Sequence, residues 1–230
     1  HKTLPALTQT ALLHVKGELV DFEKIKFYWG VFQSTSPSYV LLAGIDNCMG
    51  LMRDSADELF EKYIKELKKL REGISALNNI GLYDTDDISK VVLYIKEGHL
   101  NGKQFYDILL EKYHIQMEMA SKHYVIAMTS VGDRKEYYVR FLDALSSIDK
   151  MIEGFSKKTE SYSSVAGIPK AETAVRPSIA LKSISEDVFF EEARGKISNA
   201  SVCVYPPGIP VISTGEVITA ESIEYIRAAQ

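Results

Sequence analysis

Between residues 90 and 152, short apolar runs alternate with longer amphipathic ones. The runs at 90–95 (KVVLYI), 115–119 (IQMEM) and 124–129 (YVIAMT) have the length and apolar content of strands, whereas 103–113 and 133–152 have the spacing of helices. A β-α-β-β-α order requires a sheet covered by helices, because each amphipathic helix must bury its apolar face against another layer. The sequence therefore predicts a small α/β domain at residues 78–155.

The segment before this domain, residues 1–77, is predicted to be mainly helical. Apolar spacing indicates a strand at 9–16 and helices at 22–31, 40–52 and 56–77. Asp21 has the type and position of an N-cap for the first of these helices. The polar pair Asp54-Ser55 is expected to separate the last two.

Residues 156–230 form a third segment with a different composition. Lys, Ser, Thr and Gly predominate at 156–171, which is typical of a linker. Beyond it the patterning predicts a short helix near 186–193, two strands around 201–205 and 211–212, and a final helix at 220–228. This part is expected to be a small α+β extension.

Two groups of polar residues have types that suit chemistry. Lys2 lies almost directly before an apolar run, and lysine is a nucleophile in proteins when its surroundings lower its pKa, most often toward carbonyl groups. Ser34, Thr35 and Ser36 precede a predicted helix, where hydroxyls and free N–H groups make a phosphate site. The alternatives are a solvated charge for Lys2 and a simple helix cap for the hydroxyl residues.

Residues 1–11 (HKTLPALTQTA) resemble the stretch around the pyridoxal-phosphate lysine of the Orn/Lys/Arg decarboxylases, which are fold-type-I enzymes. Residues 34–39 (STSPSY) and 205–210 (YPPGIP), the latter with Gly215-Glu216, resemble two further stretches of the same family, in the same order. The resemblance covers the whole chain, but only the part of the family from its lysine onward.

The resemblance implies a fold and an activity. Residues 1–77 would be the end of a fold-type-I large domain, followed by the small α/β domain at 78–155 and the extension at 156–230. The implied reaction is pyridoxal-phosphate-dependent decarboxylation of arginine, lysine or ornithine to an amine and CO2. The partners implied are a basic amino acid, a second copy of the chain in a homodimer or larger homo-oligomer, and the missing N-terminal half of the same polypeptide.

The resemblance also assigns roles to individual residues. Lys2 would carry pyridoxal phosphate, His1 would touch the cofactor phosphate or the substrate, and the hydroxyls of Ser34, Thr35 and Ser36 would reach the cofactor phosphate of the neighbouring subunit. Recognition of the distal cation of a basic amino acid needs an acid, for which Glu118 is a candidate. An exposed strand face explains Glu118 equally well.

Composition and charge exclude several other classes. The formal net charge of −4 gives no basic field for nucleic acid or an acidic membrane, and no apolar run reaches the length of a membrane span. The two cysteines, Cys48 and Cys203, make neither a disulfide framework nor a metal cluster, and the histidines lack metal-ligand spacing. This usage is typical of a cytoplasmic protein without a metal site.

Two alternatives to the decarboxylase remain. In this family the acid that pairs with the cofactor ring, the ring-stacking aromatic residue and the glycine/serine phosphate loop come before the lysine. The chain by itself is therefore expected to be inactive. It would otherwise be a non-catalytic assembly or binding module, or a degenerate paralogue that keeps the fold without the cofactor.

Overall fold

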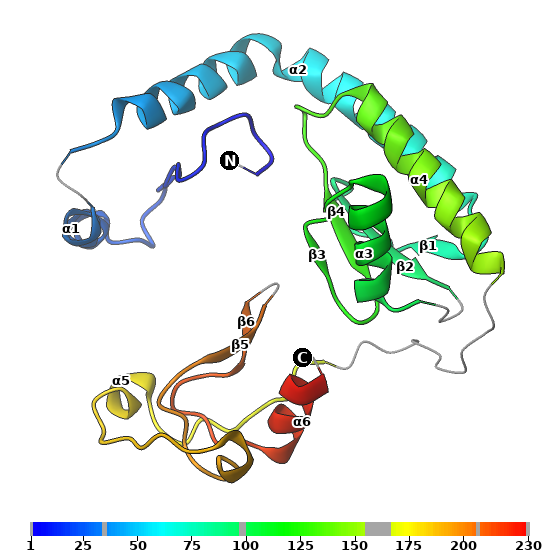
Figure 1. The fold of residues 1–230 in the computed structure, drawn as a ribbon. Helices are drawn as coiled ribbons and strands as arrows, with labels where there is room; N and C mark the ends of the chain where they lie inside the picture. Colours follow the sequence, from blue (N-terminus) through cyan, green and yellow to red (C-terminus); the bar gives the residue numbers. More distant parts are fainter. Residues whose placement is uncertain (1, 34–35, 97–99, 155–166, 206–207, 229–230) are drawn as a thin grey trace.

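The computed structural model describes residues 2–33, 36–96, 100–154, 167–205 and 208–228. An N-terminal coil leads into helix α1 (Phe22–Phe32), which is followed by the 37-residue helix α2 (Tyr39–Ser75). Figure 1 shows α2 running from this N-terminal part to a sheet flanked by helices, with a separate C-terminal unit beyond. The mixture of helices and strands agrees with the predicted α/β class, and the boundaries proposed at residues 77 and 155 stay predictions.

Helices α1 and α2 each begin at a residue that caps them. The Asp21 carboxylate accepts a hydrogen bond from the Lys24 N–H at 3.0 Å, as predicted, and the Ser38 hydroxyl accepts one from Leu41 at 3.4 Å. The predicted break at Asp54-Ser55 is wrong, because α2 continues through both residues. Each costs well under 1 kcal/mol in a helix interior, unlike glycine or proline, so this pair does not end the helix.

The central sheet has the strand order β1-β2-β4-β3 and is antiparallel throughout. Its strands are β1 (Ile80–Leu82), β2 (Lys90–Ile95), β3 (Met119–Ala120) and β4 (Val125–Met128). Helices α3 (Gly102–Tyr113) and α4 (Lys135–Glu153) and the end of α2 share one core with the sheet. Along β2, Val91, Leu93 and Ile95 are buried and the residues between them are half-buried, so that one face meets the core.

A buried carboxylate joins α4 to the connection between α2 and β1. Asp149 is 5% exposed, and it accepts hydrogen bonds from the N–H groups of Asn78 (3.1 Å), Asn79 (2.7 Å) and Ile80 (3.1 Å). The Asn79 side chain also donates to the Asp149 carbonyl oxygen at 3.0 Å. Since a buried charge is tolerated only when it is well paired or hydrogen-bonded, these amides explain why an acid can occupy the core side of α4.

Gly81 allows an aromatic ring to lie across the first strand pair. It faces Tyr94 directly in the β1–β2 register, and an added Cβ would lie 2.2 Å from the Tyr94 ring. We expect Gly81→Ala to lower the free energy of unfolding by about 1–2 kcal/mol, because the ring must move and lose its contact with Tyr83. Urea denaturation measures this loss. At Gly132 the nearest atom to an added Cβ is 3.5 Å away, so Gly132→Ala is the matched control; an equal effect of both would contradict the prediction.

The C-terminal unit has a small core of its own. It contains α5 (Pro177–Ala180), the 3₁₀ turn η1 (Phe190–Glu192), the antiparallel pair β5 (Val202–Val204) and β6 (Ile209–Ile212), and α6 (Ala220–Ala228). Val211, Ile212 and Ile226 are buried together. The Thr219 hydroxyl accepts a hydrogen bond from the Ser222 N–H at 3.1 Å, which caps α6, and the helix itself lies at its predicted range of 220–228. The unit is α+β in composition, as expected.

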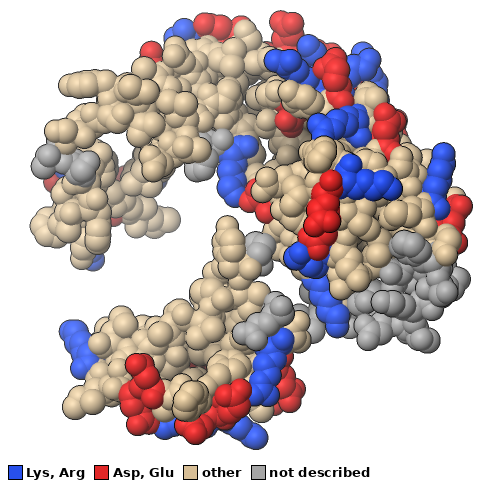
Figure 2. Space-filling view, viewed as in Figure 1, with Lys and Arg blue, Asp and Glu red and all other residues tan. Residues whose placement is uncertain are grey.

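The N-terminal part exposes much apolar surface. No side chain of α1 is buried, and Phe22, Phe27, Trp29 and Phe32 are all exposed. Figure 2 shows that charged side chains are sparse over this part of the face, in contrast to the helices beside the sheet. A helix with no buried side chain gains little from tertiary packing, so these side chains are available to another surface.

The strand predicted at residues 9–16 is wrong, since this segment is coil. A strand needs a neighbour to satisfy its backbone N–H and C=O groups, and none lies beside it among the described residues.

The described residues contain no helix that is both long and apolar enough to cross a membrane.

Candidate active site around Lys2 and Glu118

The amine of Lys2 forms an ion pair with Oε1 of Glu118, 116 positions away in the chain. The contact joins two residues that the sequence suggested for separate roles, one for the cofactor and one for the substrate. Both side chains are partly exposed, 58% for Lys2 and 39% for Glu118, so the pair lies where a small molecule has access to it. The structure thus places both in one candidate site.

The sheet determines the direction in which Glu118 points. Its N–H donates to the Ile126 carbonyl oxygen of β4 at 2.8 Å, which extends the β3–β4 pairing by one residue. Met117 and Met119, on either side, are buried at 3% and 9% exposure. Because successive side chains of a strand point to opposite faces, the Glu118 carboxylate must point away from the core.

The segment that carries Lys2 is held against α2. Leu7 packs over Gly44, where an added Cβ would lie 3.1 Å from the Leu7 side chain. A local turn is closed by the Ala6 N–H donating to the Leu4 carbonyl at 2.8 Å, and the Thr10 hydroxyl donates to Leu7 at 2.6 Å. These contacts keep the coil close to α2 without making it a strand.

The electrostatic surroundings hold Lys2 in its charged form. The hydrogen bond to Glu118 and then its charge raise the pKa of Lys2 above the ordinary value, slight desolvation opposes this, and Tyr205 adds a small increase. A raised pKa keeps the amine protonated to higher pH. This is the reverse of the lowered pKa that activates a free lysine as a nucleophile, so the amine is held here as an ammonium.

The predicted phosphate-binding residues are described only in part. His1, Ser34 and Thr35 lie outside the described residues, and Ser36 is exposed just before α2. The first N–H groups of a helix have no partner from the helix ladder, and at the start of α2 that of Leu41 donates to the Ser38 hydroxyl. No hydrogen bond joins Ser36 to Lys2 among the described residues.

A pocket of about 510 Å³ extends from Glu118 across β4 to the start of α4. Within it the Thr129 hydroxyl donates to the Ser89 carbonyl oxygen at 3.0 Å, so the Tyr63 hydroxyl, 2.7 Å from Thr129, must be the donor to it. Burial, the largest cause, raises the pKa of Tyr138, whose hydroxyl donates to Asp133 at 3.4 Å. These hydroxyls donate within the protein, and Asp133 accepts from Tyr138, so Glu118 is the carboxylate of the pocket that pairs with Lys2.

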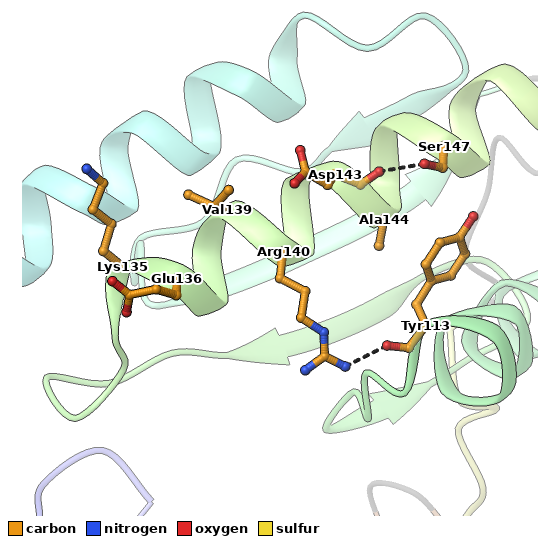
Figure 3. Close-up of a pocket in the computed structure, with 8 residues that line it drawn as sticks. All are labelled: Tyr113, Lys135, Glu136, Val139, Arg140, Asp143, Ala144 and Ser147. Carbon is orange, nitrogen blue, oxygen red and sulfur yellow. Dashed lines mark hydrogen bonds between the residues drawn. The ribbon is translucent and has the colours of Figure 1, made fainter.

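A second groove runs along α4 and has a structural explanation. Its one guanidinium, that of Arg140, donates to the carbonyl oxygen of Tyr113 at 2.6 Å, as Figure 3 shows, and to that of His114 at 2.8 Å, both at the end of α3. Arg140 thereby satisfies carbonyl groups that a helix end leaves without a partner. None of the predicted site residues lines this groove.

Two parts of the chain match known protein families. The Orn/Lys/Arg decarboxylase major domain matches residues 1–132, and the Orn/Lys/Arg decarboxylase C-terminal domain matches residues 170–230. The first match alone covers more than half of the chain. The chain belongs to the Orn/Lys/Arg decarboxylase family. The resemblance found in the sequence is thus confirmed at the level of the family.

Several members of this family align with almost the entire chain. The arginine decarboxylases of Bacillus anthracis and Bacillus subtilis are 29% and 27% identical to it over 99% and 98% of its length. The inducible lysine decarboxylase of Escherichia coli is 22% identical over 96%. The chain covers 48%, 48% and 42% of these proteins, so it spans about half the length of the curated relatives that it matches.

Solved structures of family members have the same fold. The lysine decarboxylase of Francisella novicida superimposes with a TM-score of 0.79 at 19% identity, covering 99% of this chain and 43% of that one. The constitutive lysine decarboxylase of Escherichia coli gives 0.71 at 17% identity, with coverage of 99% and 44%. The fold of these two lysine decarboxylases therefore extends over almost all of this chain.

Two features near the site were not predicted: the position of Tyr205 and a group of three hydroxyl residues. Tyr205 belongs to the YPPGIP motif, yet nothing in its surroundings indicates that it lies near Lys2, because the two are 203 positions apart. The hydroxyl network of Tyr63, Thr129 and Tyr138 also went unrecognised, since isolated hydroxyl residues in apolar runs have no signature of their own.

Proposed function

We propose that the protein is a pyridoxal-phosphate-dependent decarboxylase that converts arginine, lysine or ornithine to its amine and CO2, with Lys2 as the residue that carries the cofactor. The observation that carries the proposal is the contact of Lys2, the lysine of the family motif, with Glu118, a partly exposed acid 116 positions away in the chain. An amine and a carboxylate that the fold brings together at an accessible position are candidates for a catalytic site.

The residues present fit the cofactor. A primary amine at an accessible position can condense with an aldehyde, and the start of α2 offers Ser36, Ser38 and its first N–H groups to a phosphate. When bound, pyridoxal phosphate supplies the ring that takes up the electrons of the breaking Cα–carboxylate bond. Lys2 would then anchor the cofactor of its own subunit, and the hydroxyl-bearing helix start would orient the anionic end of the neighbouring subunit's cofactor.

The substrate class follows from the relatives and from the charge of the site. The relatives are named arginine and lysine decarboxylases, whose substrates carry a distal cation. Glu118 at the rim of its pocket remains the candidate acceptor for such a cation. The same Oε1 atom pairs with Lys2 in this structure, so a substrate cation would bind there only after Lys2 has moved to the cofactor.

Assembly is the second part of the proposal. The exposed apolar residues of α1 need a covering surface, which we assign to the preceding half of the polypeptide and to a second subunit. In such a homodimer Ser34, Thr35 and Ser36 reach the cofactor phosphate of the neighbour. The chain alone would then lack both its covering surface and part of its site, and would be inactive.

Borohydride reduction followed by peptide mapping tests the role of Lys2. Reduction of the protein with pyridoxal phosphate should fix the pyridoxyl group on the peptide that contains Lys2, since borohydride traps a lysine–aldehyde adduct irreversibly. Lys16 and Lys26, both exposed lysines of the same N-terminal part, serve as internal controls. An adduct on either of them in place of Lys2 would refute the assignment.

The exposed apolar surface of α1 also favours the second candidate, a non-catalytic assembly module. The two functions differ in one measurement. CO2 release from arginine, lysine or ornithine by the protein with its preceding half identifies a decarboxylase, whereas no release with intact oligomers identifies the module.

A further inference from the structure

The position of the Glu118 carboxylate is set by the sheet and does not depend on its contact with Lys2. Its backbone is paired with Ile126, and the buried Met117 and Met119 fix the outward direction of its side chain. Lys2, in contrast, has a four-carbon stem with freely rotating bonds and an amine that can turn toward several partners. The carboxylate is therefore the fixed member of the pair and the amine is the movable one.

The pair contributes little to the stability of the fold. Both side chains are more than a third exposed, and exposed ion pairs stabilise proteins only weakly. Its effect is on Lys2 itself, because it determines where the amine lies and whether the amine holds a proton.

We propose that Glu118 is a positioning residue for Lys2: its carboxylate holds the amine as an ammonium at the edge of β3 whenever no covalent partner occupies it. The inference rests on the proposed function, in which Lys2 alternates between a bound and a released state. In the cofactor-free protein, the ammonium of Lys2 has a fixed acceptor within reach. To react as a nucleophile, the amine must leave the carboxylate and lose a proton.

The groups that act on Lys2 among the described residues are few. Glu118, directly before β3, forms the contact, and Tyr205 after β5 acts more weakly. Both raise the pKa of Lys2, so the unprotonated amine becomes available only at higher pH than for a lysine without these neighbours. Removing the Glu118 carboxylate should therefore move the reactivity of Lys2 toward lower pH.

Competitive labelling with acetic anhydride measures this shift directly. On the protein freed of cofactor, acetylation of Lys2 is followed by mass spectrometry across a pH series, with the exposed Lys26 of α1 as internal reference. In Glu118→Gln we expect acetylation of Lys2 to rise about two- to fivefold at pH below its normal midpoint, the range typical of losing one exposed ion pair. Glu118→Asp retains the charge and should restore most of the wild-type profile.

Glu111→Gln is the matched control, because Glu111 is an exposed acid of α3 that does not contact Lys2, and the substitution makes the same change in charge. Its Lys2 profile should equal that of the wild type. An unchanged profile in Glu118→Gln, or an equal shift in Glu111→Gln, would overturn the proposal.

Loading with pyridoxal phosphate separates this inference from the proposed function. At neutral pH, absorbance should show faster condensation of the cofactor with Lys2 in Glu118→Gln than in the wild type. Failure of every variant to bind cofactor would refute the cofactor role of Lys2 while the labelling result still decides the role of Glu118. Cofactor binding at equal rates in all variants would refute the role of Glu118 alone.

Discussion

Replacing Lys2 with alanine is expected to reduce decarboxylation by at least about a thousandfold, because a covalent anchor for the cofactor has no substitute once its amine is gone. The fold should persist, since the Lys2 side chain contributes only an exposed ion pair to Glu118. The measurement is CO2 release from arginine, lysine and ornithine by the protein with its preceding half, together with the absorbance of bound cofactor.

Lys16→Ala is the control for this substitution, because Lys16 is an exposed lysine of the same N-terminal coil. It should keep full activity. If Lys2→Ala retained most of its turnover while folded, another lysine would have to carry the cofactor, and the resemblance of residues 1–11 to the family motif would have no catalytic meaning here.

Replacing Asp149 with alanine should lower the free energy of unfolding by about 3–5 kcal/mol, since three backbone N–H groups lose their acceptor at once and each unsatisfied buried group is costly. The bonds concerned link α4 to Asn78, Asn79 and Ile80, so the entry to β1 should open first. Urea denaturation gives the loss, and amide hydrogen exchange at Ile80 shows where it falls.

Two variants of α4 sharpen this test. Asp149→Asn keeps an oxygen acceptor and the shape of the side chain, so its loss should be smaller than that of alanine. Asp143→Ala removes an exposed acid from the same helix and should change stability little. Similar losses for Asp143→Ala and Asp149→Ala would mean that helix propensity, and not the buried hydrogen bonds, determines the effect.

The sequence predicted those elements whose apolar pattern is completed by their own neighbours. Strand β2 and helices α3 and α4 form one core, and each lies close to its predicted range. Strand β1 went unrecognised because Ile80–Leu82 has only three residues, with a glycine in the middle. The prediction of a strand at residues 9–16 was wrong for the opposite reason. The apolar pattern there suits a strand, but no neighbouring strand is present among the described residues to pair with it.

For the candidate site, residue types were predictable and contacts were not. Lys2 and Glu118 were each singled out, one from its motif and one from its charge in an apolar strand. Their pairing depends on how the N-terminal coil folds back on α2 through Leu7 and Gly44, which no local pattern encodes. Cys203 shows the same limit, since its strand-like surroundings predict burial and it is exposed.

The uninterrupted α2 has a mechanical consequence. At a rise of 1.5 Å per residue its 37 residues make a rod about 55 Å long. Leu67, Leu70 and Ile74 clamp one end into the sheet core, while the other end carries Ser38 and has no buried residue before Cys48. The helix is therefore a lever with its pivot in the core. The hydroxyl-bearing tip lies about 47 Å from Leu70, so a tilt of about 5° displaces it by about 4 Å. Changes in the packing of α4 against α2 are therefore expected to move Ser38 at the far end of the helix.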